Sequence, residues 1–429
     1  MGAKKNKNPA VLLIIVAALG YFVDIYDLVL FNVVKIESLK EIMTGASAEE
    51  IKNTGQFLFG MQMMGMLIGG ILWGVWGDKK GRLTVLFGSI LLYSVANVAN
   101  AFVQDVTMYA IVRVFAGIGL AGELGAGITL VAETMSKENR GYGTMIIVTF
   151  GALGAVVAAI VGMKGEVIGI FLGNIFNTTF SNWQVAYIVG GGLGLLLLLL
   201  RVGTIESGMF KNLTHQNVRK GDFRIIFQNK ENARKYLYCI LVGLPIWYII
   251  GLLVAMSEEV FANELNIQGK VVNGEAIKWA YIGLSFGDLL SGLISQIWRS
   301  RRKVVFLYLG FSLAMVLYFL FFAHGISSDT FYLVCFLLGT ATGYWAIFVT
   351  MASEQFGTNI RSTVTNTVPN FVRGSVMPMQ MLNGFLLSMF TDNVTSVLIV
   401  GIISMALAFY ANMKLKETFS KDLDYIEVS

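Results

Sequence analysis

The sequence predicts an all-α integral membrane protein with twelve transmembrane helices in two pseudo-symmetric bundles of six. Its 429 residues are 55% hydrophobic and only 14% charged, whereas soluble domains carry about 25% charged residues. The apolar residues form runs long enough to cross a bilayer core of about 30 Å as helices, and they lack the alternation of barrel strands. The expected spans are residues 11–34, 55–76, 83–103, 107–133, 141–162, 183–201, 236–256, 276–298, 303–323, 330–352, 363–388 and 395–413.

Lysine and arginine residues predict the orientation of these spans. Most of the 32 basic residues lie near the chain ends and in alternate loops, which the positive-inside rule places in the cytoplasm. Both termini are therefore expected there. The first apolar run is too long for a signal-peptide core and is expected to stay as the first span. The net charge of +5 is spread between apolar runs, so the expected surroundings are a lipid bilayer and not nucleic acid.

The longest hydrophilic stretch divides the chain in two. Residues 202–235 separate six spans from six and are basic, as a cytoplasmic linker would be. The expected organisation is an N-terminal six-helix bundle of residues 1–201, this linker, and a second bundle with a cytoplasmic tail in residues 236–429.

The two halves resemble repeats of each other. Glu133 and Arg140 recur as Glu354 and Arg361, and both pairs are separated by 221 residues. The same offset carries Lys80 onto Arg301. Parallel repeats of this kind place a substrate site between the halves, near the middle of the bilayer.

A charged, glycine-rich turn between the second and third spans is the most specific feature of the chain. It reads G-V-W-G-D-K-K-G-R from Gly74 to Arg82 and includes Asp78 and Gly81. Each of its charges would cost about 2.5–3.5 kcal/mol at a helix centre in lipid, so the turn must face water. This pattern resembles the loop between helices 2 and 3 of the major facilitator superfamily. The resemblance implies that fold and a carrier function.

The loop residues of both repeats are expected to form a cytoplasmic gate. Ion pairs among them would hold the outward-open state without touching substrate. The residues of this predicted gate are Gly74, Asp78, Gly81, Arg82, Glu133, Arg140, Glu354 and Arg361.

Charges within the first and fourth spans are candidates for proton coupling, because intramembrane ionisable residues are functional by default. Asp24 and Asp27 share one helical face, and Arg113 and Glu123 lie in span 4. A carboxylate that alternately meets and loses Arg113 would bind and release a proton. Other interpretations stay open. Arg113 could anchor a backbone carbonyl, Asp24 could face cavity water, and Glu123 could mark close packing or a substrate pocket.

Span 11 carries a polar stripe that predicts substrate binding. Asn366, Asn370 and Arg373 are spaced for one helical face, and Asp288 lies at a similar depth in span 8. The charges could hold the two ends of a zwitterion, or they could form a salt bridge with each other. Two aromatic pairs could stack a planar ligand or serve as packing and interfacial anchors. They are Trp247 with Tyr248, and Tyr344 with Trp345.

Longer patterns suggest a branch of the family. Y-F-V-D-I-Y-D-L at 21–28, R-V-F-A-G-I-G-L-A-G-E from Arg113, and E-S-G-M-F from Glu206 resemble the metabolite:proton symporters, and most of all the phagosomal nutrient transporters of bacteria. The resemblance implies a monomer in the bacterial inner membrane that imports a small polar metabolite (an amino acid, nucleoside or organic acid) with protons, by alternating access.

Two other functions stay open: a proton-driven exporter of the same fold, and a nutrient sensor that moves nothing. An enzyme is not expected. No phosphate-binding G-x-x-x-x-G-K-[ST] occurs, and the two histidines, His215 and His324, are predicted in loops. No cofactor or metal site is therefore predicted.

Overall fold

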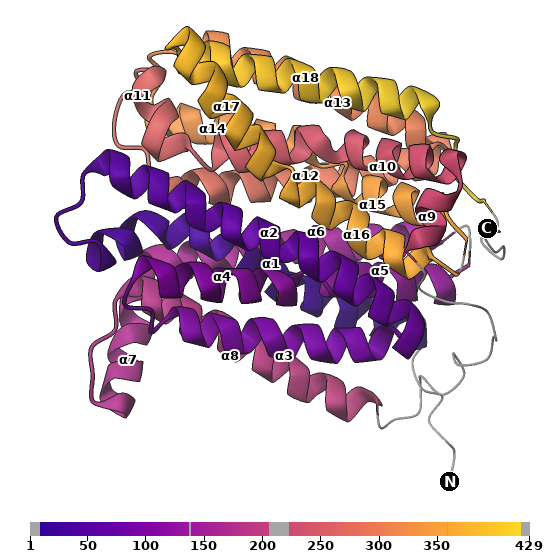
Figure 1. Ribbon diagram of the computed structural model, residues 1–429, viewed down its shortest axis with the longest axis horizontal. Helices are drawn as coiled ribbons and strands as arrows, with labels where there is room; N and C mark the ends of the chain where they lie inside the picture. The colour runs from indigo at the N-terminus through magenta and orange to yellow at the C-terminus, as the bar shows by residue number, and fades with distance from the viewer. Residues whose placement is uncertain (1–8, 137–138, 206–222, 358, 422–429) are drawn as a thin grey trace.

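The computed structural model describes residues 9–136, 139–205, 223–357 and 359–421. Helices α1–α8 form one side of the molecule and α9–α18 the other, drawn in indigo to magenta and in red to yellow (Figure 1). These sets are called the N-terminal group and the C-terminal group below. Half of the predicted linker, residues 206–222, lies outside the described residues.

The N-terminal group consists of α1 (Pro9–Ile42), α2 (Ala48–Lys80), α3 (Arg82–Asn100), α4 (Val106–Leu120), α5 (Glu123–Thr134), α6 (Arg140–Lys164), α7 (Glu166–Phe176) and α8 (Asn182–Ile205). The C-terminal group consists of α9 (Arg224–Gln228), α10 (Lys230–Tyr248), the π-helices η1 (Ile249–Val254) and η2 (Ser257–Phe261), α11 (Ala262–Glu264), α12 (Asn273–Trp298), α13 (Arg301–Phe322), α14 (Ser328–Thr342), α15 (Trp345–Glu354), α16 (Arg361–Gly374), α17 (Val376–Phe390) and α18 (Asn393–Lys414).

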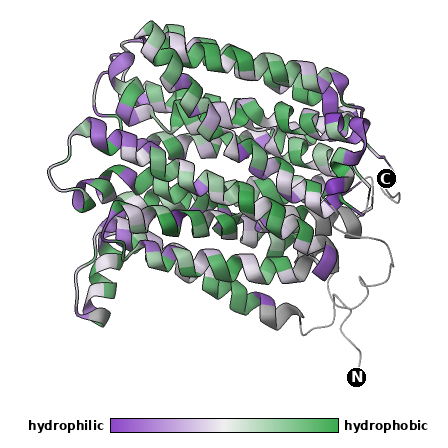
Figure 2. Cartoon of the chain, in the orientation of Figure 1, coloured by the Kyte–Doolittle hydropathy of each residue, from purple (hydrophilic) through white to green (hydrophobic). Residues whose placement is uncertain are grey.

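The predicted all-α membrane fold is confirmed. Among the described residues, nine segments are long and apolar enough to cross a membrane, and Thr84–Asn100 is a shorter apolar helix. The remaining expected spans are α12 and the pair α16–α17. Hydrophilic residues gather at the two ends of the bundle and hydrophobic residues cover its length (Figure 2), as an apolar solvent around the middle requires.

Several spans are broken, which the sequence did not predict. Span 4 divides into α4 and α5 at Ala121–Gly122, and span 10 divides into α14 and α15 at Gly343–Tyr344. Gly122 and Gly343 are related by the same 221-residue offset as the loops. A side chain satisfies one of the freed carbonyls: Trp73 donates to Ile118 O at 2.6 Å. Irregular backbone at this depth is tolerated only where protein surrounds it.

Glycines let the two groups approach closely. A Cβ built on Gly74 of α2 would lie 3.1 Å from the Cα of Thr363 on α16, so a larger side chain there would separate the groups. Gly81 joins α2 to α3 with φ of 97°, a conformation that favours glycine. Ion pairs join the groups at both ends, Arg140 with Glu354 at one and Lys35 with Glu259 at the other. These are called the Arg140 end and the Lys35 end.

Candidate functional site

A small central cavity, with a volume of about 20 Å³, lies between the two groups. Most of its walls are apolar or aromatic, and Arg373 is the one charged residue among the described residues that line it. Such a mixture is typical of small-molecule sites, where a few polar groups orient a ligand against an apolar wall. The lining residues are Tyr21, Ile25, Val148, Ala152, Ile246, Trp247, Ile250, Tyr281, Leu284, Trp345 and Arg373.

Arg373 lies on α16 with aromatic groups on two sides. Its guanidinium carbon is 5.4 Å from the ring centre of Trp345, and Nη2 donates to the hydroxyl of Tyr21 at 3.3 Å. The indole of Trp345 donates to the same hydroxyl at 2.9 Å. Tyr21 belongs to the N-terminal group, so this triad spans both groups. The sequence predicted Arg373 and Trp345 as substrate residues but not Tyr21, although Tyr21 begins the aromatic-acidic pattern of span 1.

Asp24 faces the same guanidinium. Its Oδ2 lies 3.9 Å from Nη2 of Arg373, which is within ion-pair range but too long for a hydrogen bond. Neither carboxylate oxygen has a hydrogen-bond partner among the described residues, and the side chain is fully buried. A buried carboxylate with so weak a partner is energetically costly.

Asp27 lies one turn along α1 and points at α8. A Cβ on Gly190 would overlap its Oδ1, so the missing side chain there makes room for the carboxylate. Neither of its oxygens has a hydrogen-bond partner in the described part of the chain. The structure thus leaves two unsatisfied carboxylates on neighbouring turns of one helix.

Arg113 does not form a direct ion pair with Asp27 here. Its Nη2 donates to Oε1 of Gln62, its Nη1 donates to the Tyr187 hydroxyl at 3.5 Å, and its guanidinium lies 4.7 Å from the ring centre of Phe31. Of the two interpretations left open by the sequence, this arrangement is nearer the anchor, although the anchor is a glutamine side chain and not a backbone carbonyl.

Glu123 begins α5 and pairs with Arg201 of α8, with 3.0 Å between Oε2 and Nη1. A carboxylate at a helix N-terminus is favoured by the exposed N–H groups there. A Cβ on Gly20 would overlap both side chains, so Gly20 accommodates the pair. The sequence did not predict Arg201 as the partner of Glu123, although Arg201 is the last residue of the predicted span 183–201.

Asp288 caps the second half of the broken span 10. Its Oδ1 accepts a hydrogen bond from the backbone N–H of Ala346 at 2.9 Å, at the start of α15. The alternative salt bridge between Asp288 and Arg373 is replaced by the pairing of Arg373 with Asp24. Asp288 therefore holds Trp345, the residue before Ala346, at the cavity wall.

The asparagines of the polar stripe join α16 to the break in span 4. Asn370 donates to Ala121 O at 2.8 Å across the two groups and accepts from Nη1 of Arg373 at 3.3 Å. Asn366 packs against Gly125 of α5, where a Cβ would overlap its amide oxygen. These residues position Arg373 and close the interface below the cavity.

The four predicted aromatic residues divide into two kinds. Trp247 and Trp345 line the cavity. Tyr248 instead donates to Val397 O at 2.8 Å, and Tyr344 donates to Val242 O at 3.0 Å. The two tyrosines are packing anchors within the C-terminal group, while the two tryptophans are placed to contact a ligand.

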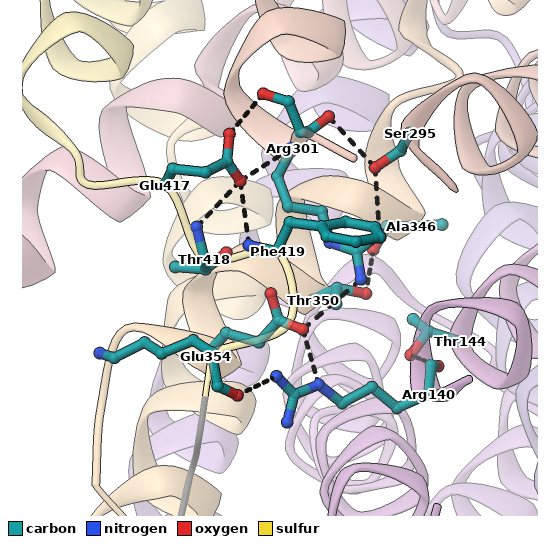
Figure 3. A network of polar contacts seen from close by, with 12 residues as sticks. Arg140, Thr144, Ser295, Arg301, Ala346, Thr350, Glu354, Glu417, Thr418 and Phe419 are labelled. Carbon is teal, nitrogen blue, oxygen red and sulfur yellow. Dashed lines mark hydrogen bonds and ion pairs between the residues drawn. The ribbon is translucent and has the colours of Figure 1, made fainter. Parts of the chain in front are cut away.

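At the Arg140 end, three buried charges join the groups (Figure 3). Nε of Arg140 lies 2.8 Å from Oε1 of Glu354, and Nη2 of Arg301 lies 3.5 Å from the same oxygen. Arg361, buried at the start of α16, lies in the same repeat loop as Glu354. The side chains of Asp78, Arg82 and Glu133 lie outside the described residues.

The segment after α18 crosses this end of the bundle. Glu417 accepts from Ser300 Oγ and from the backbone N–H of Arg301 at 2.9 Å, so it caps α13. Arg301 stacks over the Phe419 ring at 5.1 Å, and Arg140 donates to Lys421 O at 2.7 Å (Figure 3). The tail therefore adds contacts to Arg301 and Arg140 that the sequence did not reveal.

At the Lys35 end, Nζ of Lys35 lies 2.9 Å from Oε1 of Glu259 and donates to Ala255 O at 3.1 Å. The amide of Asn273 donates to Asn32 O at 2.8 Å. Both contacts join α1 to the C-terminal group. Lys35 and Glu259 fall in predicted loops, so nothing in the sequence indicated that they meet.

The chain is similar in sequence to known membrane transporters. The sequence model of the Major Facilitator Superfamily matches residues 17–377. A putative niacin/nicotinamide transporter of Bacillus subtilis is 24% identical over 376 residues, covering 83% of this chain and 84% of that protein. The benzoate transport protein of Acinetobacter baylyi is 21% identical over 412 residues, covering 88% and 83%.

Two solved structures have the same fold. The proton:xylose symporter XylE superposes with a TM-score of 0.68 at 16% identity, covering 97% of this chain and 98% of that one. The Escherichia coli fucose:proton symporter FucP superposes with a TM-score of 0.69 at 13% identity, covering 96% and 100%. Together with twelve spans, an internal repeat and a cavity between the two groups, the family match establishes that this chain belongs to the Major Facilitator Superfamily of transporters.

Proposed function

We propose that this chain is a proton-coupled importer of small planar carboxylates, such as aromatic or unsaturated organic acids. The observation that carries the proposal is the position of Arg373, a cation against the indole of Trp345 at the wall of an otherwise apolar cavity. A guanidinium binds a carboxylate through paired N–H donors, and flanking aromatic rings favour a flat, apolar remainder. Relatives named for niacin, benzoate and cis,cis-muconate support this substrate class.

The proposed coupling uses Asp24. A substrate carboxylate that binds Arg373 takes the place of Asp24, which lies 3.9 Å away without hydrogen bonds. The displaced, buried carboxylate is then unpaired and must bind a proton, because an isolated buried charge is far costlier than the neutral acid. One substrate anion and one proton would thus load together. A zwitterion would bind less well, because Asp288, the carboxylate predicted to bind its cationic end, already caps α15.

The transport cycle we propose is alternating access by a monomer. The two groups rock around the cavity while the ion pairs at the Arg140 and Lys35 ends open in turn. The Arg140 end would face the cytoplasm of a bacterial inner membrane, because the basic loops lie there. Both termini would then be cytoplasmic.

The test is flux in proteoliposomes that contain the purified full-length protein and an internal pH dye. Labelled benzoate or nicotinate is supplied outside under an inward proton gradient, and protein-free vesicles correct for passive entry of the neutral acid. The expected result is saturable accumulation with simultaneous internal acidification. Asp24→Asn should abolish accumulation, whereas Asp105→Asn, at an exposed helix cap, should leave it unchanged.

The rival functions give different results in the same vesicles. Substrate that leaves loaded vesicles when protons enter would support an exporter. Binding without any flux would support a sensor. Flux of substrate without protons, equal in wild type and Asp24→Asn, would contradict coupling through Asp24.

A further inference from the structure

A chain of buried hydroxyl groups runs through the N-terminal group from the Lys35 end. Ser38 Oγ lies 3.4 Å from the Tyr109 hydroxyl, which lies 2.7 Å from the Tyr187 hydroxyl. All three side chains are fully buried, and they come from α1, α4 and α8. Tyr187 also accepts a hydrogen bond from Arg113 at 3.5 Å, which fixes the last hydroxyl of the chain.

The inner end of the chain lies one helical turn from the place where Asp27 meets α8, and among the described residues no hydrogen bond joins Tyr187 to Asp27. Gly190, three residues after Tyr187 on α8, is the residue against which Oδ1 of Asp27 lies, and three residues place two positions on one helical face. Tyr26 donates to Ala186 O at 2.9 Å, which holds this part of α1 against α8. The titratable and charged groups that face Asp27 are Asp24 and Tyr26 on α1, Tyr93 on α3, Arg113 on α4 and Tyr187 on α8.

The outer end of the chain, at the buried Ser38, lies one helical turn from an exposed carboxylate. Ser38 also hydrogen-bonds to Lys35 O at 3.2 Å, so its hydroxyl has two orientations available. Glu41, one turn further along α1, is exposed and accepts a hydrogen bond from Trp183 at 2.7 Å. An exposed carboxylate can take up protons from water at the mouth of such a chain.

We propose that protons reach Asp27 through the hydroxyl chain Ser38–Tyr109–Tyr187, by a route separate from the substrate cavity. None of these three residues is among those that line the cavity in the described part of the chain. This inference rests on the proposed function, because it supplies the proton that the coupling carboxylates need. It adds that a proton can arrive while Lys35 and Glu259 keep the substrate route closed.

The transfer balances without any other reactant. Each hydroxyl oxygen accepts a proton from the group before it and releases its own proton to the group after it. One O–H bond forms and one breaks at each position, and the carboxylate of Asp27 becomes a carboxylic acid. Rotation of the three hydroxyls then restores the starting pattern.

The test measures protonation of Asp27 directly and needs no substrate. The full-length protein in liposomes receives an acid jump, and the carboxylic acid band of Asp27, identified by its absence in Asp27→Asn, is followed by time-resolved infrared spectroscopy. Tyr109→Phe and Tyr187→Phe should slow its appearance by roughly 10²-fold, the usual cost of losing a positioned proton-transfer group. Their final band amplitude at equilibrium should match the wild type.

Tyr344→Phe is the matched control, because it also removes a fully buried hydroxyl that has one hydrogen-bond partner. It should leave the protonation rate unchanged. Wild-type rates in both chain variants, or an equal slowing in Tyr344→Phe, would overturn the proposal. If Tyr109→Phe and Tyr187→Phe slow the protonation of Asp27 but the wild type shows no substrate-driven proton uptake, the result would support the hydroxyl chain and contradict symport. If both variants protonate Asp27 at the wild-type rate while substrate-driven proton uptake is normal, the result would contradict the hydroxyl chain but not the proposed symport.

Discussion

Asp24 and Arg373 face each other across the interface of the two groups, with 3.9 Å between Oδ2 and Nη2. The guanidinium of Arg373 instead donates hydrogen bonds to Tyr21 and Asn370, at 3.3 Å each. An ion pair without hydrogen bonds leaves donors and acceptors free on both sides. The pair is therefore suited to exchange partners, whereas the buried Arg140–Glu354 pair at 2.8 Å is suited to hold.

Replacing Arg373 should remove binding of the carboxylate substrate. Loss of one partner of a buried charge pair costs about 2–5 kcal/mol, so Arg373→Gln should weaken benzoate binding by roughly 30-fold or more. The benzoate affinity of Arg373→Lys should lie between those of the wild type and Arg373→Gln, because an ammonium keeps the charge but lacks the paired donors. Quenching of the fluorescence of Trp345 gives the affinity. Arg302 donates to the carbonyls of Asn412 and Met413 and is not among the described residues that line the cavity, so Arg302→Gln should bind as the wild type does.

Breaking the ion pair at the Arg140 end should open that end. Glu354→Gln removes the charge shared by Arg140 and Arg301, and a buried pair that loses one partner is strongly destabilised. The thiol of a Ser362→Cys reporter, at a position buried beside Gly77, should then be alkylated at least several times faster. Glu231→Gln breaks the exposed pair with Lys416, which is worth little, and should change nothing. Equal alkylation rates in all three proteins would contradict the gate.

The opposite change is expected at the Lys35 end. Lys35→Gln removes the contacts to Glu259 and to Ala255 O, so a Met163→Cys reporter, at a position that packs beside Gly274, should become more reactive. Because opening one end favours closure of the other, alkylation of the Ser362→Cys reporter should slow. Lys278→Gln, in a partly exposed pair within one helix, is the control. Faster labelling at both positions would indicate general loosening and not alternating access.

Gly125 should control how closely the groups meet. A Cβ there would lie 2.7 Å from the Cα of Asn366 and overlap its amide, so Gly125→Ala must push α16 from α5. We expect a carrier that stays open at the Arg140 end, with transport lost and the Ser362→Cys reporter highly reactive. Gly192→Ala meets nothing within 4 Å and should transport normally. Normal transport in Gly125→Ala would show that this contact does not limit closure.

Contact between the tail and the gate should depend on pH. Burial alone would raise the pKa of Glu417, but hydrogen bonds from Ser300 and the N–H groups of Arg301, Phe419 and Thr418 hold it below its ordinary value. A carboxyl whose folded pKa is lowered contributes stability above its unfolded pKa of about 4.3 and loses it as the pH falls through the folded value.

A spin label at Ser420 should therefore be immobile near neutral pH and become mobile only in acid below about pH 4. Glu417→Gln should make it mobile at every pH, because an amide cannot accept the same set of hydrogen bonds with a charge. A label that stays immobile in Glu417→Gln would show that Phe419 and Lys421 hold the tail without Glu417.

Much of this molecule could be predicted from its sequence because lipid imposes simple rules. Hydropathy located the spans, and one offset related Glu133 and Arg140 to Glu354 and Arg361. Intramembrane charges are rare, so Asp24 and Arg373 were visible as candidates. That Arg140 and Glu354 would belong to one gate followed from the repeat.

What could not be predicted depends on which faces of different helices meet. In the sequence, Arg201 ends a predicted span and Lys35 lies just beyond one, yet each is buried against a carboxylate of another helix. The helix breaks at Gly122 and Gly343 fall in ordinary apolar runs. Tyr187 is one tyrosine among 16, and only the contact with Tyr109 gives it a proposed role.

Helix α1 is continuous over 34 residues, while spans 4, 10 and 11 are each built in two pieces. It carries Asp24 beside Arg373 and Lys35 at one end, eleven positions or about 16 Å apart. A continuous helix behaves as a rod, so a small tilt that frees Asp24 must also displace Lys35. In the proposed cycle, the timing between ligand loading and opening is then mechanical: a proline or a pair of glycines between the two residues would leave both sites intact and let them move out of step.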